Sequence, residues 1–217
     1  VVIAADGVNS FIARQAGIRA REPRKHLAVG VKSVVRLPRK LLEDRFRLND
    51  REGVAYAVVG EATRGCAGGG FLYTNIDSVS VGVVLRLDDL TAKGLASSDV
   101  HDHFLSHPAI APLLKDGELL EYGCHLTIED GPAMAAHDLT RPGLLIIGDA
   151  GGFTLNTGMT IRGMGIWRPA AHSLRRGPPG RRWPTGTSPR SPWTATARSW
   201  GGASWVRTWS STRSSPP

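Results

Sequence analysis

The chain has 217 residues and a formal charge of +8, but its two ends differ sharply in composition. Residues 165–217 contain nine Arg, all six Trp and eight of the fourteen Pro, and they contain no Lys, Asp or Glu. Residues 1–164 therefore carry 18 basic against 19 acidic side chains. Residues 1–164 are numerous enough to form one hydrophobic core. Their near-neutral charge excludes a basic nucleic-acid-binding domain as the default interpretation of this part of the chain.

The two cysteines, Cys66 and Cys124, are 58 positions apart and belong to no C-x-x-C pair. His125, beside Cys124, matches no motif and is left unassigned. This pattern argues against a zinc or iron–sulfur site held by the chain, so we expect no metal. The cysteine usage predicts a reducing, cytoplasmic location, with contact at the inner membrane surface as the alternative. The apolar runs are strand-sized, so we expect no segment that spans a bilayer.

The first residues predict a strand, a tight turn and a capped helix. Residues 1–5 read as a buried strand with no Met or turn residue before them, so we expect the natural chain to begin upstream. Asp6 and Gly7 form the turn, and a helix is predicted over residues 11–16, ending at Gly17.

The rest of the first 164 residues predicts a β-rich middle followed by a second α/β piece. The predicted strands span 29–37, 54–59, 70–74 and 78–87, and the predicted short helices span 39–46 and 100–105. A buried strand over 144–147 then enters Gly148-Asp149-Ala150-Gly151-Gly152. A strand that enters a glycine-rich turn before a helix is typical of α/β architecture.

This order predicts an α/β fold in which an α+β domain is inserted into a partial Rossmann-like domain. The nucleotide-binding domain would comprise residues 1–24 and 136–164, and the β-rich substrate or partner domain would comprise residues 25–135. Residues 165–217 would form a disordered or out-of-frame tail.

The glycine-rich segment predicts part of a dinucleotide site. The carboxylate of Asp149 can accept hydrogen bonds from ribose or ribityl hydroxyls, and the glycines let backbone N–H groups approach a pyrophosphate where a helix begins. The alternative is an ordinary helix N-cap with a tight turn. The turn at Asp6 and Gly7 favours the nucleotide site, because both turns would end parallel strands at one edge of a sheet.

The chain resembles FAD-dependent oxidoreductases of the FixC and electron-transfer-flavoprotein:quinone oxidoreductase family. The segments that carry this resemblance are residues 2–10, residues 148–158 and Arg162-Gly163-Met164. That superfamily includes geranylgeranyl reductases and aromatic hydroxylases. Three middle segments support the resemblance: 26–32, 42–46 and 68–75. The resemblance covers residues 1–164 and implies an upstream G-x-G-x-x-G turn. Gly68-Gly69-Gly70 is no substitute, because its spacing is wrong and it leads into a strand.

The resemblance implies that FAD is the cofactor, and it indicates which residues would lie near FAD. The residues that it places near the nucleotide, the pyrophosphate and the flavin are Asp6, Gly7, Gly148, Asp149, Ala150, Gly151, Gly152, Asn156, Thr157 and Gly158. Tyr73 would face a quinone or a partner protein, although an aromatic residue on a strand is more often core. No catalytic acid or base is assigned.

The same resemblance implies electron transfer from an electron-transfer flavoprotein to quinone or to a ferredoxin-like subunit. The missing cysteine set fits FixC-like members, which are associated with a separate ferredoxin-like subunit. The alternatives are an isoprenoid (geranylgeranyl) reductase, a non-functional truncated or frameshifted product, and a nucleic-acid binder that uses the Arg and Trp of the tail.

The composition of the tail favours translation out of frame, because its residues have GC-rich codons. If Gly165 is encoded by GGG, reading the codons of Gly165 to Arg168 in a shifted frame can give Asp-Leu-Ala. After Gly163-Met164 this makes Gly-Met-Asp-Leu-Ala, the order that the resemblance leads us to expect in a continuing helix.

Overall fold

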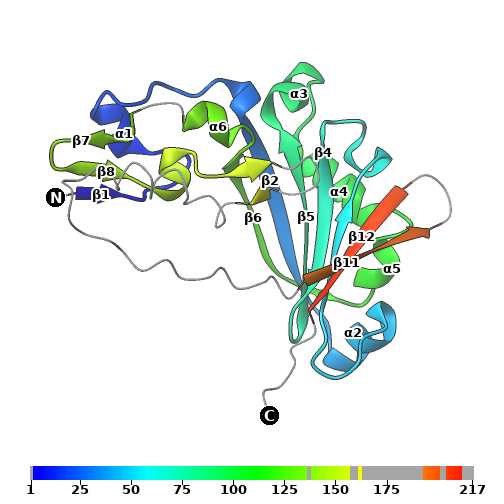
Figure 1. Cartoon of the computed structure of the whole chain (residues 1–217). Helices are drawn as coiled ribbons and strands as arrows, with labels where there is room; N and C mark the ends of the chain where they lie inside the picture. Colours follow the sequence, from blue (N-terminus) through cyan, green and yellow to red (C-terminus); the bar gives the residue numbers. More distant parts are fainter. Residues whose placement is uncertain (1, 136–137, 157–160, 163–192, 201–203, 212–217) are drawn as a thin grey trace, which may run out of the picture. The chain divides into compact units, whose positions relative to one another are not determined.

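A computed structural model of the chain describes residues 2–135, 138–156, 161–162, 193–200 and 204–211, and Figure 1 traces their course. These residues form two compact units. The described residues within Val1–Leu27 and Thr127–Ser191 form unit 1, and those within Ala28–Leu126 and Pro192–Pro217 form unit 2. The middle domain was expected over residues 25–135, whereas the first segment of unit 2 ends inside strand β6 (Glu118–Ile128), which continues into unit 1.

Unit 1 contains a three-stranded sheet with the order β1-β8-β7. The strands of this sheet are β1 (Val2–Ala4), β7 (Thr140–Arg141) and β8 (Leu144–Ile146). A separate two-stranded sheet pairs β9 (Leu155–Asn156) with β10 (Ile161–Arg162) in the antiparallel sense. The helices of unit 1 are α1 (Phe11–Gln15), α6 (Gly131–Met134), and the 3-10 helices η1 (Arg24–His26) and η3 (Gly148–Gly151). β1 and β8 pair in parallel, and β7 pairs with β8 in the antiparallel sense. A small core of Ala4, Ala13, Ile18, Ile146 and Ala150 joins this sheet to α1.

Unit 2 is built on a seven-stranded sheet with the order β11-β12-β3-β4-β5-β2-β6, in which every neighbouring pair from β11 to β2 is antiparallel. Besides β6, its strands are β2 (Leu27–Arg36), β3 (Val54–Val58), β4 (Gly68–Thr74), β5 (Ser78–Arg86), β11 (Trp193–Trp200) and β12 (Ser204–Ser211). Its helices are α2 (Arg39–Phe46), η2 (Glu61–Thr63), α3 (Leu87–Ala92), α4 (Ser97–Ser106) and α5 (Ala111–Leu114).

The core of unit 2 lies where α4 packs against the sheet. Val81 and Val83, two residues apart on β5, are fully buried, because successive side chains of a strand alternate between its faces. They share one hydrophobic cluster with Phe104 of α4. Gly70 of β4 makes room for this helix, since a Cβ there would lie 2.5 Å from the Phe104 ring.

The mixed α/β class predicted from the sequence is confirmed. Two strands lie in the C-terminal segment that was expected to be disordered: β11 and β12 form an antiparallel pair, and β12 extends the sheet beside β3. Thr and Trp are frequent in these two segments and favour strands. Residues 163–192, 201–203 and 212–217 lie outside the described part of the chain.

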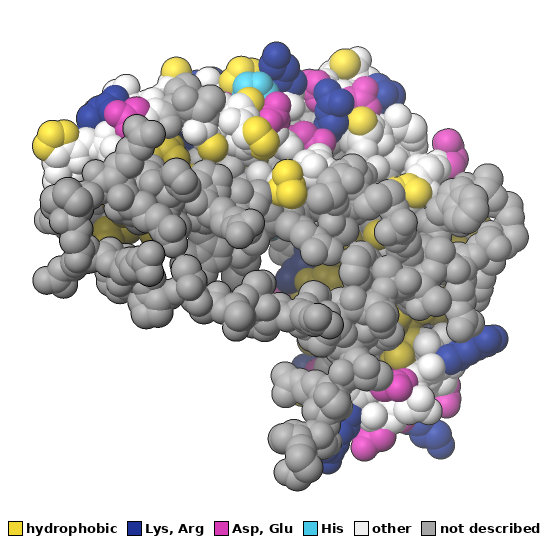
Figure 2. Space-filling view, in the orientation of Figure 1, with side chains coloured by type: hydrophobic (Ala, Val, Ile, Leu, Met, Phe, Trp, Pro, Cys, Tyr) yellow, Lys and Arg dark blue, Asp and Glu magenta, His cyan; other side chains and the backbone are white. Residues whose placement is uncertain are grey.

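Acidic and basic side chains are interspersed on the described surface that Figure 2 shows, with single apolar side chains among them. This distribution agrees with the near-neutral balance of residues 1–164 and differs from a nucleic-acid-binding face, on which basic side chains gather.

Candidate functional site

The parallel pair β1 and β8 brings the two predicted turns to one edge of the unit 1 sheet. Val2, Ile3 and Ala4 are in register with Leu144, Leu145 and Ile146. The backbone N–H of Ile147 then donates to the Ala4 carbonyl at 2.9 Å. Both strands run in the same direction, so the turn after β1 and the turn after β8 begin side by side. The carboxyl edge of parallel strands is where open α/β sheets bind ligands.

In the first turn the Asp6 carboxylate holds the start of α1. Its Oδ1 accepts from the Ser10 hydroxyl at 2.6 Å and its Oδ2 accepts from the Ile12 N–H at 3.1 Å. Burial raises the pKa of Asp6, but the hydrogen bonds to the ionised form together outweigh this effect, and the pKa is lowered overall. Gly7 has φ +79° with open space around it, so the turn needs glycine for its backbone.

In the second turn Gly148 and Asp149 form the exposed part. Gly148 has φ +62° and a Cβ there would meet no atom within 4 Å. Asp149 is exposed, and no other described residue donates a hydrogen bond to its carboxylate in the structure. The carboxylate is therefore available to accept hydrogen bonds from hydroxyl groups of a ligand.

The second turn also contains three buried residues: Ala150, Gly151 and Gly152. A Cβ on Gly152 would lie 2.6 Å from the Cβ of Met134, so α6 packs directly against this glycine. These three residues were predicted to line the pyrophosphate and the approach to the flavin. In the structure none of the three has an exposed side chain.

The helix predicted to begin at this turn is not formed by the described residues. Gly148–Gly151 form the four-residue 3-10 helix η3, and Gly152, with φ +74°, ends it. The Phe153 N–H donates back to the Gly148 carbonyl at 3.2 Å, and the chain goes on into β9. Two successive glycines favour this reversal over a continued α-helix.

The remaining predicted residues lie on β9, on β4 or outside the described residues. Asn156 of β9 donates its side-chain N–H to Glu129 Oε1 at 2.9 Å. Thr157 and Gly158 lie outside the described residues. Tyr73 is on β4 of unit 2, 36% exposed, with its ring stacked on Phe71 at a centroid distance of 5.8 Å.

Arg19 is a site residue that sequence reasoning missed. It follows the predicted helix in an irregular segment, where an arginine is normally a solvated surface residue. In the structure it is 5% exposed and contacts both turns: Nη2 donates to the Val8 carbonyl at 2.7 Å and Nη1 donates to the Ala150 carbonyl at 2.9 Å. No periodic pattern or short motif marks it.

Neither a metal site nor a membrane-spanning helix is found in the described part of the chain. Its His, Cys, Asp and Glu side chains form no group of three or more that could hold a metal ion. None of its helices is both long enough and apolar enough to cross a membrane.

Comparisons with known proteins identify relatives for most of the chain. No protein-family profile matches it. The probable electron transfer flavoprotein-quinone oxidoreductase YdiS of Escherichia coli (strain K12) is 45% identical over 166 residues, which cover 76% of this chain and 38% of that protein. Protein FixC of Salmonella typhi is 45% identical over 166 residues, which cover 76% of this chain and 39% of that protein.

A solved structure supports the fold. A geranylgeranyl bacteriochlorophyll reductase-like protein from Thermoplasma acidophilum superimposes with a TM-score of 0.50 at 19% identity, over 70% of this chain and 34% of that one. The chain spans about two fifths of the length of the curated relatives named above. Over the part that these relatives match, the chain is similar to electron transfer flavoprotein-quinone oxidoreductases and to FixC proteins.

Proposed function

We propose that the chain contributes part of the FAD site of an oxidoreductase that takes electrons from an electron-transfer flavoprotein and passes them to a quinone. The observation that carries the proposal is the parallel pairing of β1 and β8, because it places the turn at Asp6 and the turn at Asp149 at one sheet edge. The names of the relatives support the electron donor and the quinone. A ferredoxin-like subunit is the alternative electron acceptor.

The residues at this edge fit a flavin dinucleotide. Asp149 would accept from ribityl or ribose hydroxyls, because its carboxylate is exposed and no described residue donates to it. Gly148 would allow close approach of the ligand, since a Cβ there meets no atom within 4 Å. Asp6 and Gly7 would support the nucleotide indirectly, by fixing the conformation of the first turn. The Asp6 carboxylate does so by accepting hydrogen bonds from Ser10 and Ile12. When bound, FAD would supply the electron-transfer chemistry.

Unit 2 would supply the quinone or partner contact through Tyr73. Its ring stacks on Phe71 at 5.8 Å, and it is the more exposed of this aromatic pair. A planar quinone can stack on an aromatic ring and accept a hydrogen bond from a phenol hydroxyl.

The test is anaerobic electron transfer with the whole chain. The purified chain is saturated with FAD, freed of excess FAD, chemically reduced, and mixed with a water-soluble quinone. We expect the visible flavin absorbance to return while one quinol forms for each flavin reoxidised. Bound flavin that stays reduced with quinone and with ferredoxin would contradict the proposed acceptors. Loss of a double bond from an isoprenoid substrate under the same conditions would identify the reductase instead.

A further inference from the structure

Arg19 connects two segments that are far apart in the sequence. Its two terminal nitrogens donate to different carbonyls, that of Val8 in the first turn and that of Ala150 in the second. The second contact spans 131 sequence positions. A guanidinium presents its N–H groups in a fixed planar fork, so both carbonyls are held at a defined separation by one rigid group.

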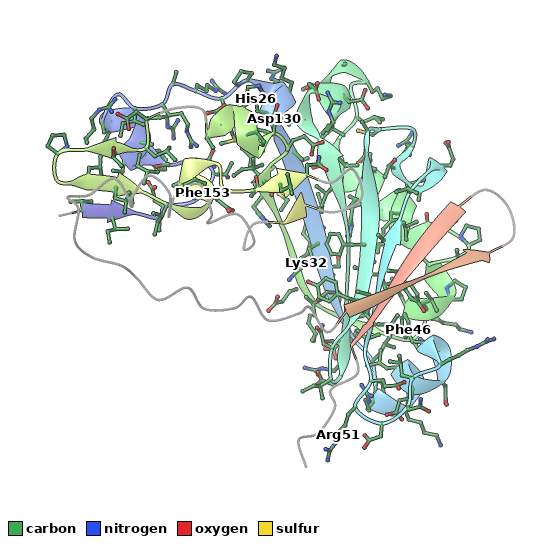
Figure 3. All side chains as sticks on the ribbon, viewed as in Figure 1. His26, Lys32, Phe46, Arg51, Asp130 and Phe153 are labelled. Carbon is green, nitrogen blue, oxygen red and sulfur yellow. The ribbon has the colours of Figure 1, made fainter. Side chains whose placement is uncertain are left out.

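Neighbouring side chains hold the guanidinium in this orientation. Glu22 Oε1 lies 3.5 Å from Arg19 Nε, although Nε makes no hydrogen bond, and Glu22 Oε2 lies 3.1 Å from Nδ1 of His26. The His26 carbonyl accepts from the backbone N–H groups of Glu129 and Asp130, and His26 and Asp130 are labelled in Figure 3. The chain of contacts from Arg19 to the start of α6 thus lies within unit 1.

The burial of Arg19 shows that its position is specific. A surface arginine keeps its charged end in water, whereas Arg19 is 5% exposed. Burial lowers the pKa of Arg19, and the nearby Glu22 opposes this effect. Burying a guanidinium costs free energy unless its donors are satisfied, and here two of its nitrogens are satisfied by the backbones of the two turns.

We infer that Arg19 is the positioning residue that sets the spacing of the two turns and so shapes the edge at which Gly148 and Asp149 are exposed. Arg19 itself touches no ligand in this role. The inference rests on the proposed function only for the identity of the ligand, FAD. Its geometric part concerns residues of this chain alone.

The test compares Arg19→Met and Arg19→Lys with Arg21→Met in the full 217-residue chain. Arg21 lies two positions away and its side chain is exposed, so the same substitution there is the matched control. Hydrogen–deuterium exchange is followed in peptides that contain residues 6–10, residues 148–154 and, as an internal reference, the core strand β5. The Kd for FAD is measured on the same samples by quenching of flavin fluorescence.

We expect both turns of Arg19→Met to exchange about tenfold faster or more, with β5 and the Arg21→Met control unchanged. Arg19→Lys should also loosen both turns, because one ammonium lacks the planar fork that fits two separate carbonyls. The Kd for FAD should rise about tenfold in both Arg19 variants. If Arg19→Met fails to fold, Arg19→Lys, which keeps the charge, decides the matter.

The outcomes separate this inference from the proposed function. Arg19→Lys with unchanged exchange in either turn would overturn the positioning role. Looser turns with an unchanged Kd for FAD would also overturn it, while leaving FAD binding in place. A wild-type chain that binds no FAD would contradict the proposed function for this chain, and exchange in the two turns would still decide the role of Arg19.

Discussion

The backbone N–H of Ile147 donates to the carbonyl of Ala4 at 2.9 Å. This hydrogen bond continues the β1–β8 ladder to the point where both strands end, so the turns at Asp6 and Gly148 start from neighbouring positions. Residues more than 140 positions apart thereby share one edge of a sheet. The candidate site depends on this pairing, which lies within unit 1.

Ser10→Ala should destabilise unit 1 by about 1–2 kcal/mol, because it removes both an N-cap and a partner of Asp6. The Ser10 hydroxyl is fully buried, donates to Asp6 and accepts from the Ala13 N–H at 3.1 Å. Urea unfolding monitored by circular dichroism measures the change. Asn9→Ala, at the neighbouring exposed position, should have little effect, and equal losses in the two variants would contradict the capping role.

Gly131→Ala should destabilise the chain by about 1–3 kcal/mol, because the new methyl group would clash with backbone. The added Cβ would lie 2.7 Å from the Gly152 carbonyl oxygen and would also overlap the Thr154 carbonyl. Gly123→Ala is the matched control, because a Cβ at this position on β6 meets no atom within 4 Å. Thermal unfolding of the two variants should differ clearly, and a neutral Gly131→Ala would show that α6 does not pack on the second turn.

His101 should make unit 2 less stable in acid. Its ring is fully buried on α4, with Nε2 3.3 Å from the Ser33 hydroxyl, and burial lowers its pKa below 6.5 despite the nearby Asp102. Below pH 6.5 the unfolded chain binds a proton that the folded chain resists, so the free energy of unfolding falls as the pH decreases toward the folded pKa.

Urea unfolding at about pH 7.5 and about pH 5 measures this dependence, which His101→Gln should reduce. His103→Gln, an exposed histidine on the same helix, is the control and should keep the wild-type dependence. A wild-type dependence that survives in His101→Gln would assign the acid sensitivity to other groups.

The two cysteines should differ in reactivity. Cys66 is buried, and its burial, together with nearby Asp89, raises its pKa to about 11, whereas Cys124 is exposed on β6. The thiolate is the reactive form, so a disulfide reagent near pH 8 should label about one thiol per folded chain and two after unfolding. Cys124→Ser should abolish the rapid labelling. Rapid labelling that persists in this variant would show that Cys66 is accessible.

The sequence predicted best those elements whose signals are local. The helix over 39–46 agrees with α2 because Pro38 precedes it, and the strand over 78–87 agrees with β5, whose valines favour a strand. Strand β6 was missed, since Gly123 interrupts a segment without clear alternation. Its side chains are exposed from Glu118 to His125, so no buried face imposes a pattern on them.

The candidate site was predictable only in part. The turn motifs predicted that Asp6 and Asp149 each follow a strand, because strand, turn and glycine follow one another in the sequence. The 3-10 turn at Gly148 was not predicted, although the two successive glycines that favour it are visible in the sequence. The contacts of Arg19 could not be predicted, because they depend on two carbonyls that only the folded chain brings together.

The most direct test of the FAD site is equilibrium binding of FAD to the whole chain and to its Asp149→Ala variant. Because the Asp149 carboxylate is exposed and no other described residue donates a hydrogen bond to it, its loss should leave the free energy of unfolding unchanged. We predict that the wild-type chain binds FAD and that Asp149→Ala raises the Kd about tenfold or more, since a charge-assisted hydrogen bond is lost. Equal FAD affinity in the two proteins would contradict a cofactor site at this edge of the sheet.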